Sequence, residues 1–170
     1  SYRTDALADA QMTDSQKAYL SDMEAVTFGN TNRVLSDLDN APVTWVGKSL
    51  NMESKVELKY VFDPAGYEGD LRDLVLRVSY EDINANPKTL SIAGPEPYSG
   101  STELYVFTLD TLLAAELRTV VSVQIFAGDT PVSATLQYSA DTYGNNKKGA
   151  LLELCKALFA YSDSAKAYFQ

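Results

Sequence analysis

The sequence predicts a mainly β protein, an antiparallel β-sandwich of about seven strands, with N- and C-terminal helices packed on one sheet. Between Pro42 and Tyr138, apolar residues recur at every second position, which is typical of half-buried strands. Turn-forming residues separate these stretches at intervals of about 8 to 12 residues, as in sandwiches. Near both chain ends the apolar spacing changes to three or four, which indicates helices.

The first 41 residues are expected to hold one helix and an irregular connection. Thr13 and Gln16 fit a capping box, and the apolar residues Ala18, Leu20 and Met23 follow it, so we predict a helix over residues 14–25. Residues 28–41 are rich in Gly, Asn and Asp, which favour turns over regular structure.

Residues 42–138 are expected to form the sandwich. Its predicted strands cover residues 43–45, 56–62, 74–80, 90–92, 104–109, 120–126 and 132–138. Two of them, 104–107 and 120–126, are apolar on both faces, so something must cover the outer side of their sheet. The terminal helix is the expected cover. Residues 111–117 are expected to form a short helical crossover.

The C-terminal segment, residues 139–170, contains the strongest helical pattern of the chain. Apolar or small residues from Leu151 to Phe169 recur every three or four positions and predict one buried stripe. Cys155 lies on this stripe, where a lone cysteine is expected to pack as a small hydrophobe. A second stripe of small residues is the expected seat for the helix at 14–25, and consists of Ala157, Ala160, Ser164 and Ala167. The chain is predicted to be a single module, residues 1–170.

The tail Tyr161–Phe169 (YSDSAKAYF) resembles the end of uncharacterised accessory modules found in multi-modular secreted and cell-surface proteins of gut and rumen Firmicutes. In that family the tail reads Tyr-x-x-[Ser/Ala]-Ala-[Lys/Gln]-x-Tyr-Phe; Ser162 departs from its usual second residue. Residues 2–8, 56–62 and 136–139 also resemble parts of the family's unit. The resemblance implies an extracellular module, secreted or at the cell surface, with neighbouring modules in a longer protein.

The composition argues against two classes of partner, nucleic acids and membranes. The net charge of −9 opposes both nucleic acid and anionic membranes, so neither is an expected partner. No stretch approaches the roughly 20 apolar residues of a membrane-spanning helix, so membrane insertion is not expected.

Catalytic signals are weak. The chain contains no histidine, which excludes histidine-based triads and histidine general bases. A glycosidase needs only two carboxylates and stays open, although no pair stands out by position. We therefore expect a nonenzymatic protein with no catalytic residue and no cofactor.

No bound metal is expected, and a structural calcium ion is the minor alternative. Asp63, Glu68 and Asp70 share one loop, and a second loop contains Glu81, Asp82, Asn84 and Asn86. Such loops also accumulate these residue types for backbone reasons.

Carbohydrate binding is the expected function, with a polysaccharide or glycan as partner. Sugar sites favour exposed aromatic rings beside carboxylates and amides. Tyr67 and Tyr98 lie in turns with an acid nearby, and Trp45 lies in a short strand, so Trp45, Tyr67 and Tyr98 are the candidate ligand-binding residues. The alternative is a structural spacer or protein-interaction module, which predicts buried aromatics and a flat apolar patch.

Overall fold

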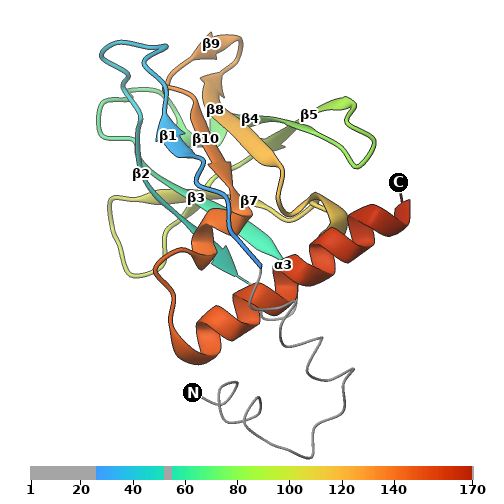
Figure 1. Cartoon of the computed structure of the whole chain (residues 1–170). Coiled ribbons are helices and arrows are strands. Elements are labelled where there is room, and N and C mark those ends of the chain that lie inside the picture. Colours follow the sequence, from blue (N-terminus) through green and yellow to red (C-terminus); the bar gives the residue numbers. More distant parts are fainter. Residues whose placement is uncertain (1–25, 52–54, 170) are drawn as a thin grey trace, which may run out of the picture.

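The computed structural model describes residues 26–51 and 55–169, with Phe169 described in its backbone only. The helix expected at residues 14–25 lies outside these residues. The described chain folds into two antiparallel sheets followed by one long helix, as Figure 1 shows. The mainly β, sandwich-like architecture is therefore confirmed.

Sheet A contains the two eight-residue strands on which the candidate site lies. Its strand order is β1-β10-β8-β4-β5, with β9 paired to the far end of β8. The strands are β1 (Asn32–Val34), β4 (Leu74–Glu81), β5 (Pro87–Ala93), β8 (Val120–Ala127), β9 (Thr130–Pro131) and β10 (Leu136–Ser139). β8 and β9 form a hairpin through Gly128, whose positive φ of 62° suits a residue without a Cβ.

Sheet B has four strands in the order β2-β3-β7-β6. They are β2 (Thr44–Asn51), β3 (Glu57–Asp63), β6 (Glu96–Pro97) and β7 (Tyr105–Leu109). The register of β2 on β3 shifts between Trp45 and Gly47, so a bulge interrupts the alternation there. Seven strands follow the sequence prediction. The very short β1, β6 and β9 are additional.

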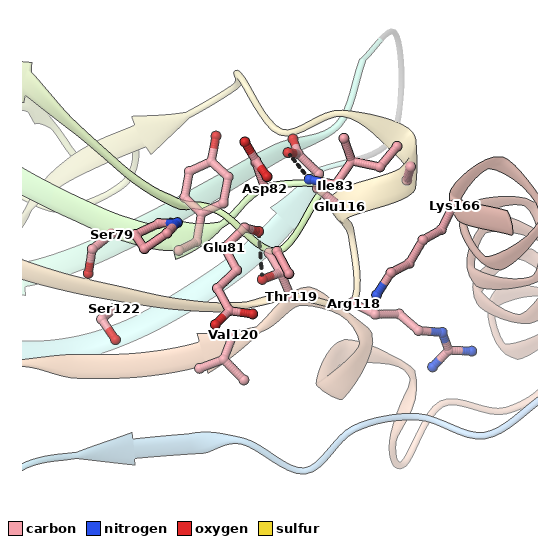
Figure 2. A pocket seen from close by; sticks show the side chains of 14 residues that line it. Ser79, Glu81, Asp82, Ile83, Glu116, Arg118, Thr119, Val120, Ser122 and Lys166 are labelled. Atoms are coloured by element: carbon pink, nitrogen blue, oxygen red, sulfur yellow. Dashed lines mark hydrogen bonds between the residues drawn. The ribbon is translucent and has the colours of Figure 1, made fainter. Parts of the chain in front are cut away.

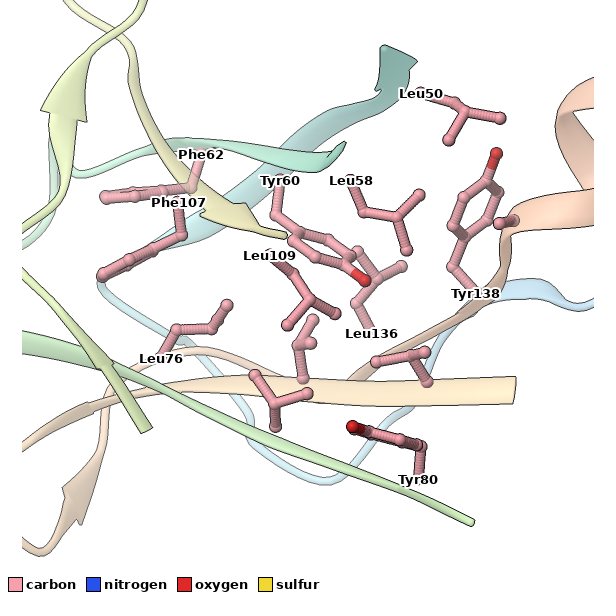
Figure 3. Close-up of a cluster of buried hydrophobic side chains, with 14 of the residues drawn as sticks. Leu50, Leu58, Tyr60, Phe62, Leu76, Tyr80, Phe107, Leu109, Leu136 and Tyr138 are labelled. Atoms are coloured by element: carbon pink, nitrogen blue, oxygen red, sulfur yellow. The ribbon is translucent and has the colours of Figure 1, made fainter. Parts of the chain in front are cut away.

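The inner faces of the two sheets share one hydrophobic core. Leu76 and Tyr80 of sheet A face Leu58, Tyr60 and Phe62 of sheet B, and all five side chains are buried (Figure 3). Their period of two places every second residue in the core and leaves the alternate side chains on the outer faces. The outer face of sheet A is therefore formed by the alternate side chains of the same strands.

The helix α3 (Gly149–Phe169) lies across one end of the sandwich (Figure 1), not on the outer face of a sheet. It packs mainly on two short 3₁₀ helices, η2 (Ala114–Glu116) and η3 (Ala140–Gly144). A third, η1 (Leu71–Asp73), precedes β4. The expectation that α3 covers a sheet was wrong. The outer side of β8 is polar at Ser122 and Gln124, and needs no such cover.

The helix buries a narrower stripe than the sequence predicted. Cys155, Phe159 and Ser162 are buried, whereas Leu154 is 52% exposed and Tyr161 is 64% exposed. Between β7 and β8, residues 111–117 form the short helix η2 and its flanks, in agreement with the short helical crossover that the sequence predicted. Only one side of α3 can face η2 and η3, so the remaining apolar residues point away from the domain.

A buried carboxylate ties this end of the molecule together. Asp141 in η3 is 4% exposed and accepts hydrogen bonds from Gly29 N at 2.7 Å and Arg118 Nη1 at 3.0 Å. Arg118 Nε in turn donates to Asp163 on α3 at 2.6 Å, and Nη1 donates to the carbonyl of Thr27 at 2.6 Å. Asp141 and Arg118 thus join three parts of the chain to one another: η3, α3 and the segment that precedes β1, Thr27–Gly29, which we call the entry segment.

Candidate functional site

The outer face of sheet A presents polar side chains from neighbouring strands side by side. Residues that pair across an antiparallel ladder point to the same side, so the strand register builds rows of side chains on this face. One row consists of Arg33, Gln137, Ser122, Ser79 and Thr89 from β1, β10, β8, β4 and β5. The next row consists of Gln124, Arg77 and Ser91. Hydroxyl, amide and guanidinium groups therefore line the three central strands.

Two adjacent hollows make a continuous trough along β4 and β8. One, of about 530 Å³, extends from Phe126 and Arg77 to Ser79 and Ser122. The other, of about 590 Å³, begins at the same two serines and continues past the end of β4 to η2 and α3. We call their union the sheet-A trough. Because β8 is eight residues long, the trough follows a strand of about 26 Å, a length that suits an extended polymer.

Several hydroxyl groups in the trough are available to a ligand. Ser79, Thr89 and Ser91 are exposed, and their hydroxyls engage no other group in the described part of the chain. Ser122 accepts a hydrogen bond from Gln137 Nε2 at 3.2 Å, and Gln124 Nε2 donates to the carbonyl of Ser133 at 2.9 Å. The amides are thus held in place while the serines of β4 and β5 stay open to a partner.

Arg77 stacks on Phe126 at one end of the trough. The Arg77 guanidinium lies 3.8 Å from the ring centre of Phe126, and its Nη2 donates to Gly128 O and Asp129 Oδ1. The planar guanidinium is thereby fixed over an aromatic ring, where it presents its remaining N–H donors in a rigid fork. It also covers Phe126, which explains how an aromatic residue is tolerated on the outer face of β8.

The opposite end of the trough carries charged groups. Figure 2 shows Glu81, Asp82 and Glu116 near the strand ends and Lys166 on α3 beside them. Both oxygens of the buried Glu116 accept backbone N–H groups, from Leu113 at 2.9 Å and from Ile83 at 3.2 Å. Asp82 likewise accepts the N–H groups of its own turn. These two carboxylates support the backbone, which leaves Glu81 and Lys166 at the surface.

The structure places Trp45 at the margin of the core. The ring is half-buried and makes edge contacts with Tyr60 and Phe62, with ring centres 6.3 and 6.5 Å away. Its indole N–H donates to Ala134 O at 2.8 Å. Trp45 therefore bridges the sheets and lines a separate hollow beneath residues 34–41. The only polar atom of the Trp45 side chain, Nε1, is already engaged in this hydrogen bond.

Tyr67 and Tyr98 occupy turns, as the sequence predicted. Tyr67 is half-buried against the core, whereas Tyr98 is 36% exposed. The register from β2 to β6 places Trp45 and Tyr98 near opposite edges of sheet B, three strand spacings or about 14 Å apart. Trp45 and Tyr98 are therefore not assembled into one platform, and neither lies on the sheet-A trough.

The two acidic loops proposed for calcium are held by turn hydrogen bonds. Asp63 accepts the N–H of Ala65, and Asp70 caps η1 through the N–H of Arg72. The Arg72 guanidinium also binds Asp70, and these bonds lower the pKa of that carboxyl to about 2. Among the described residues, no three acidic or cysteine side chains gather as metal ligands. Backbone demands explain the composition of both loops.

Comparison with protein-family models, curated proteins and solved structures finds no match to this chain. Among the described helices, none combines the length and the apolar character needed to cross a membrane. The functional argument therefore depends on the geometry of the trough.

Sequence reasoning missed the trough because its residues occupy the outward positions of amphipathic strands. Arg77 and Ser79 alternate with buried residues, a pattern that is typical of an ordinary solvated face. A weak signal was present in Ser122 and Gln124, which interrupt an otherwise apolar strand. Only strand order could show that these positions lie beside Ser79 and Ser91.

Proposed function

We propose that this protein is a noncatalytic extracellular accessory module that binds polysaccharide in the sheet-A trough. The observation that carries the proposal is the group of open hydroxyls, Ser79, Thr89 and Ser91, in a hollow beside fixed amide and guanidinium groups. Sugars present many hydroxyl groups and bind where side chains offer matching donors and acceptors. The trough is open along its length, which suits an internal stretch of a polymer.

The extracellular setting and the neighbouring modules of a longer protein are carried by the resemblance of residues 161–169 to secreted accessory modules. The predicted residues Trp45, Tyr67 and Tyr98 remain part of the proposal as separate, weaker locations for a sugar. As a further part of it, a helix over residues 14–25 joins α3, so that both ends of the chain contribute to one helical layer.

Affinity gel electrophoresis against plant, starch-type and host polysaccharides tests the proposal. We expect one polymer to retard the wild type, and expect Ser79→Ala/Ser91→Ala to weaken that retardation at least tenfold. The matched control is Thr44→Ala/Ser49→Ala, which removes the same hydroxyls from β2 and should leave binding intact. The single variants Tyr67→Ala and Tyr98→Ala report on the weaker locations. If none of the polymers retards the wild type, the proposal is contradicted.

The alternative is a structural spacer or protein-interaction module. The half-burial of Trp45 and Tyr67 favours it, because an interaction module needs no exposed aromatic platform. Under this alternative the open hydroxyls of sheet A bind only water. The electrophoresis panel separates the two functions, since a spacer predicts equal mobility in all polymers.

A further inference from the structure

A hollow of about 540 Å³ lies where the chain crosses from β1, at the edge of sheet A, to β2, at the edge of sheet B (Figure 1). We call it the Trp45 hollow. Its volume falls within the roughly 300–1,000 Å³ of small-molecule sites, which combine apolar walls with a few polar groups. Both kinds of residue line this hollow: the apolar Val34, Leu38 and Trp45, and the polar Ser36, Asp39 and Asn40.

The crossing segment is held to the connection between β9 and β10 at several points. Leu35 N donates to Thr135 O at 2.8 Å, and Val43 N donates to Val132 O at 3.0 Å. Between these two anchors, the Asp37 carboxylate accepts hydrogen bonds from the N–H and the hydroxyl of Thr135 at 2.9 and 2.6 Å. The hollow is therefore formed before a ligand arrives, which reduces the cost of ordering the site on binding.

The indole ring of Trp45 is the aromatic part of the wall. Its Nε1 donates to Ala134 O at 2.8 Å, and the ring makes edge contacts with Tyr60 and Phe62. These contacts fix the ring but leave it only half-buried, so part of the indole is open to the hollow. Because Nε1 is engaged, the open part offers an apolar surface, which suits the apolar face of a pyranose ring.

Three polar residues line the same hollow with their hydrogen-bonding groups open. The side chains of Ser36, Asp39 and Asn40 are exposed and engage no other group in the described part of the chain. A carboxylate can accept hydrogen bonds from two adjacent hydroxyls, and an amide or a serine hydroxyl can both donate and accept. The Asp39 carboxylate and the net charge of −9 disfavour an acidic sugar. These groups therefore match the hydroxyl-bearing edge of a neutral pyranose.

We infer that the Trp45 hollow binds one pyranose unit of a neutral glycan, whose apolar face packs on the indole and whose hydroxyl groups bind Ser36, Asp39 and Asn40. The inference rests on the proposed function, and it gives Trp45 the polar partners that complete a site separate from the trough. The trough is open along its length and takes an internal stretch of a polymer, whereas the hollow is confined to the crossing segment and takes a single unit.

The fluorescence emission of Trp45, the single tryptophan of the chain, reports directly on the hollow. The probes are the methyl glycosides of glucose, galactose, mannose and xylose, and short oligosaccharides of any polymer that retards the full chain. We expect at least one probe to shift the emission to shorter wavelength in a saturable manner, because a stacked sugar excludes water from the indole. Ser36→Ala/Asp39→Ala should weaken this binding about tenfold or more, the effect of losing a hydrogen bond to a charged group.

Two control variants separate the hollow from the rest of the surface. Glu103→Ala removes an exposed acid outside the hollow, and Ser79→Ala/Ser91→Ala removes open hydroxyls of the trough. Both controls should keep the Trp45 response. The Ser36→Ala/Asp39→Ala protein should unfold at the urea midpoint of the wild type, because surface substitutions that break no contact change stability little.

Failure of the inference is distinguishable from failure of the proposed function. Retardation by a polymer with unchanged Trp45 emission for every probe would overturn the inference and leave the trough as the binding site. A response lost in Ser79→Ala/Ser91→Ala but kept in Ser36→Ala/Asp39→Ala would also overturn it. A response to N-acetylleucinamide and to no sugar would overturn it in favour of an apolar side chain of a partner protein. Neither retardation nor a response to any probe would contradict both proposals.

Discussion

Asp141→Ala should be among the most damaging single changes at the helical end of the molecule. The Asp141 carboxylate is buried and joins the entry segment to Arg118 through hydrogen bonds from Gly29 N and Arg118 Nη1. Alanine removes Oδ2, the oxygen that accepts both bonds, without adding bulk. The Gly29 N–H and one edge of the Arg118 guanidinium then lose their partners inside the protein.

The expected cost follows from the contacts. A lost charge-assisted bond contributes about 1.5–3 kcal/mol, and a buried N–H left without an acceptor costs about 1–3 kcal/mol. The lower ends apply, because Arg118 keeps Asp163 and Thr27 as partners and because Asp141 Oδ1 is itself unpartnered among the described residues. We expect a loss of about 2–3 kcal/mol in the free energy of unfolding, hence a fall in Tm of roughly 5–10 °C for a chain of this size.

Thermal and urea unfolding followed by circular dichroism measure this loss. The matched control is Asp163→Ala, which removes the other carboxylate bound to Arg118. The Asp163 side chain is 54% exposed, so its removal should cost less than about 1 kcal/mol. Equal losses in the two variants, or an Asp141→Ala protein as stable as the wild type, would refute the role assigned to Asp141.

Three further predictions test other parts of the structure. Gly29→Ala would place a Cβ 2.6 Å from Asp141 Oδ1, so it should lower the unfolding free energy by about 1–3 kcal/mol; an unchanged urea midpoint would contradict the close approach. NMR titration should find the Asp70 carboxyl with a pKa of about 2, against an ordinary value of 3.8, and Arg72→Ala should raise this pKa towards the ordinary value without fully restoring it, because the backbone N–H of residue 72 still binds the carboxyl. Because this pKa is lowered on folding, the associated stabilisation is present above the ordinary pKa and is lost as the pH falls towards about 2. Burial raises the pKa of the Cys155 thiol, so a thiol reagent at pH 8 should label the native protein far more slowly than the unfolded one, and equal labelling rates would place Cys155 at the surface.

The strands could be predicted because their pattern depends on local alternation. The stretches 56–62 and 74–80 match β3 and β4 closely, since one face of each strand is buried. The two-residue strands β6 and β9 were missed, because so short a segment carries no periodic signal. Sequence alternation thus indicated the sheets without their order.

The position of α3 could not be predicted for a different reason. Its apolar residues cover more than one face, and a helical period does not say which part of a wide stripe meets the core. Cys155 and Phe159 turn inward, while Leu154 and Tyr161 turn outward.

The candidate site was beyond sequence reasoning because it depends on strand order. Ser79, Ser91 and Ser122 come from three separate strands and meet only through the ladders of β4 with β5 and β8. Two of the aromatic residues that we predicted from the sequence to bind ligand, Trp45 and Tyr67, pack partly against the core. The indole N–H of Trp45 also donates to Ala134 O. Ring exposure depends on tertiary packing, which alternation does not encode.

The most direct test of the trough as a polysaccharide site is an NMR titration of the labelled protein with oligosaccharides from whichever polymer retards it. The proposal predicts that the amide signals of Ser79, Ser91 and Ser122 shift in a saturable manner while those of Ser49 and Thr108 in sheet B stay in place. Shifts confined to sheet B or to the neighbourhood of Tyr98, with the trough signals unmoved, would contradict it.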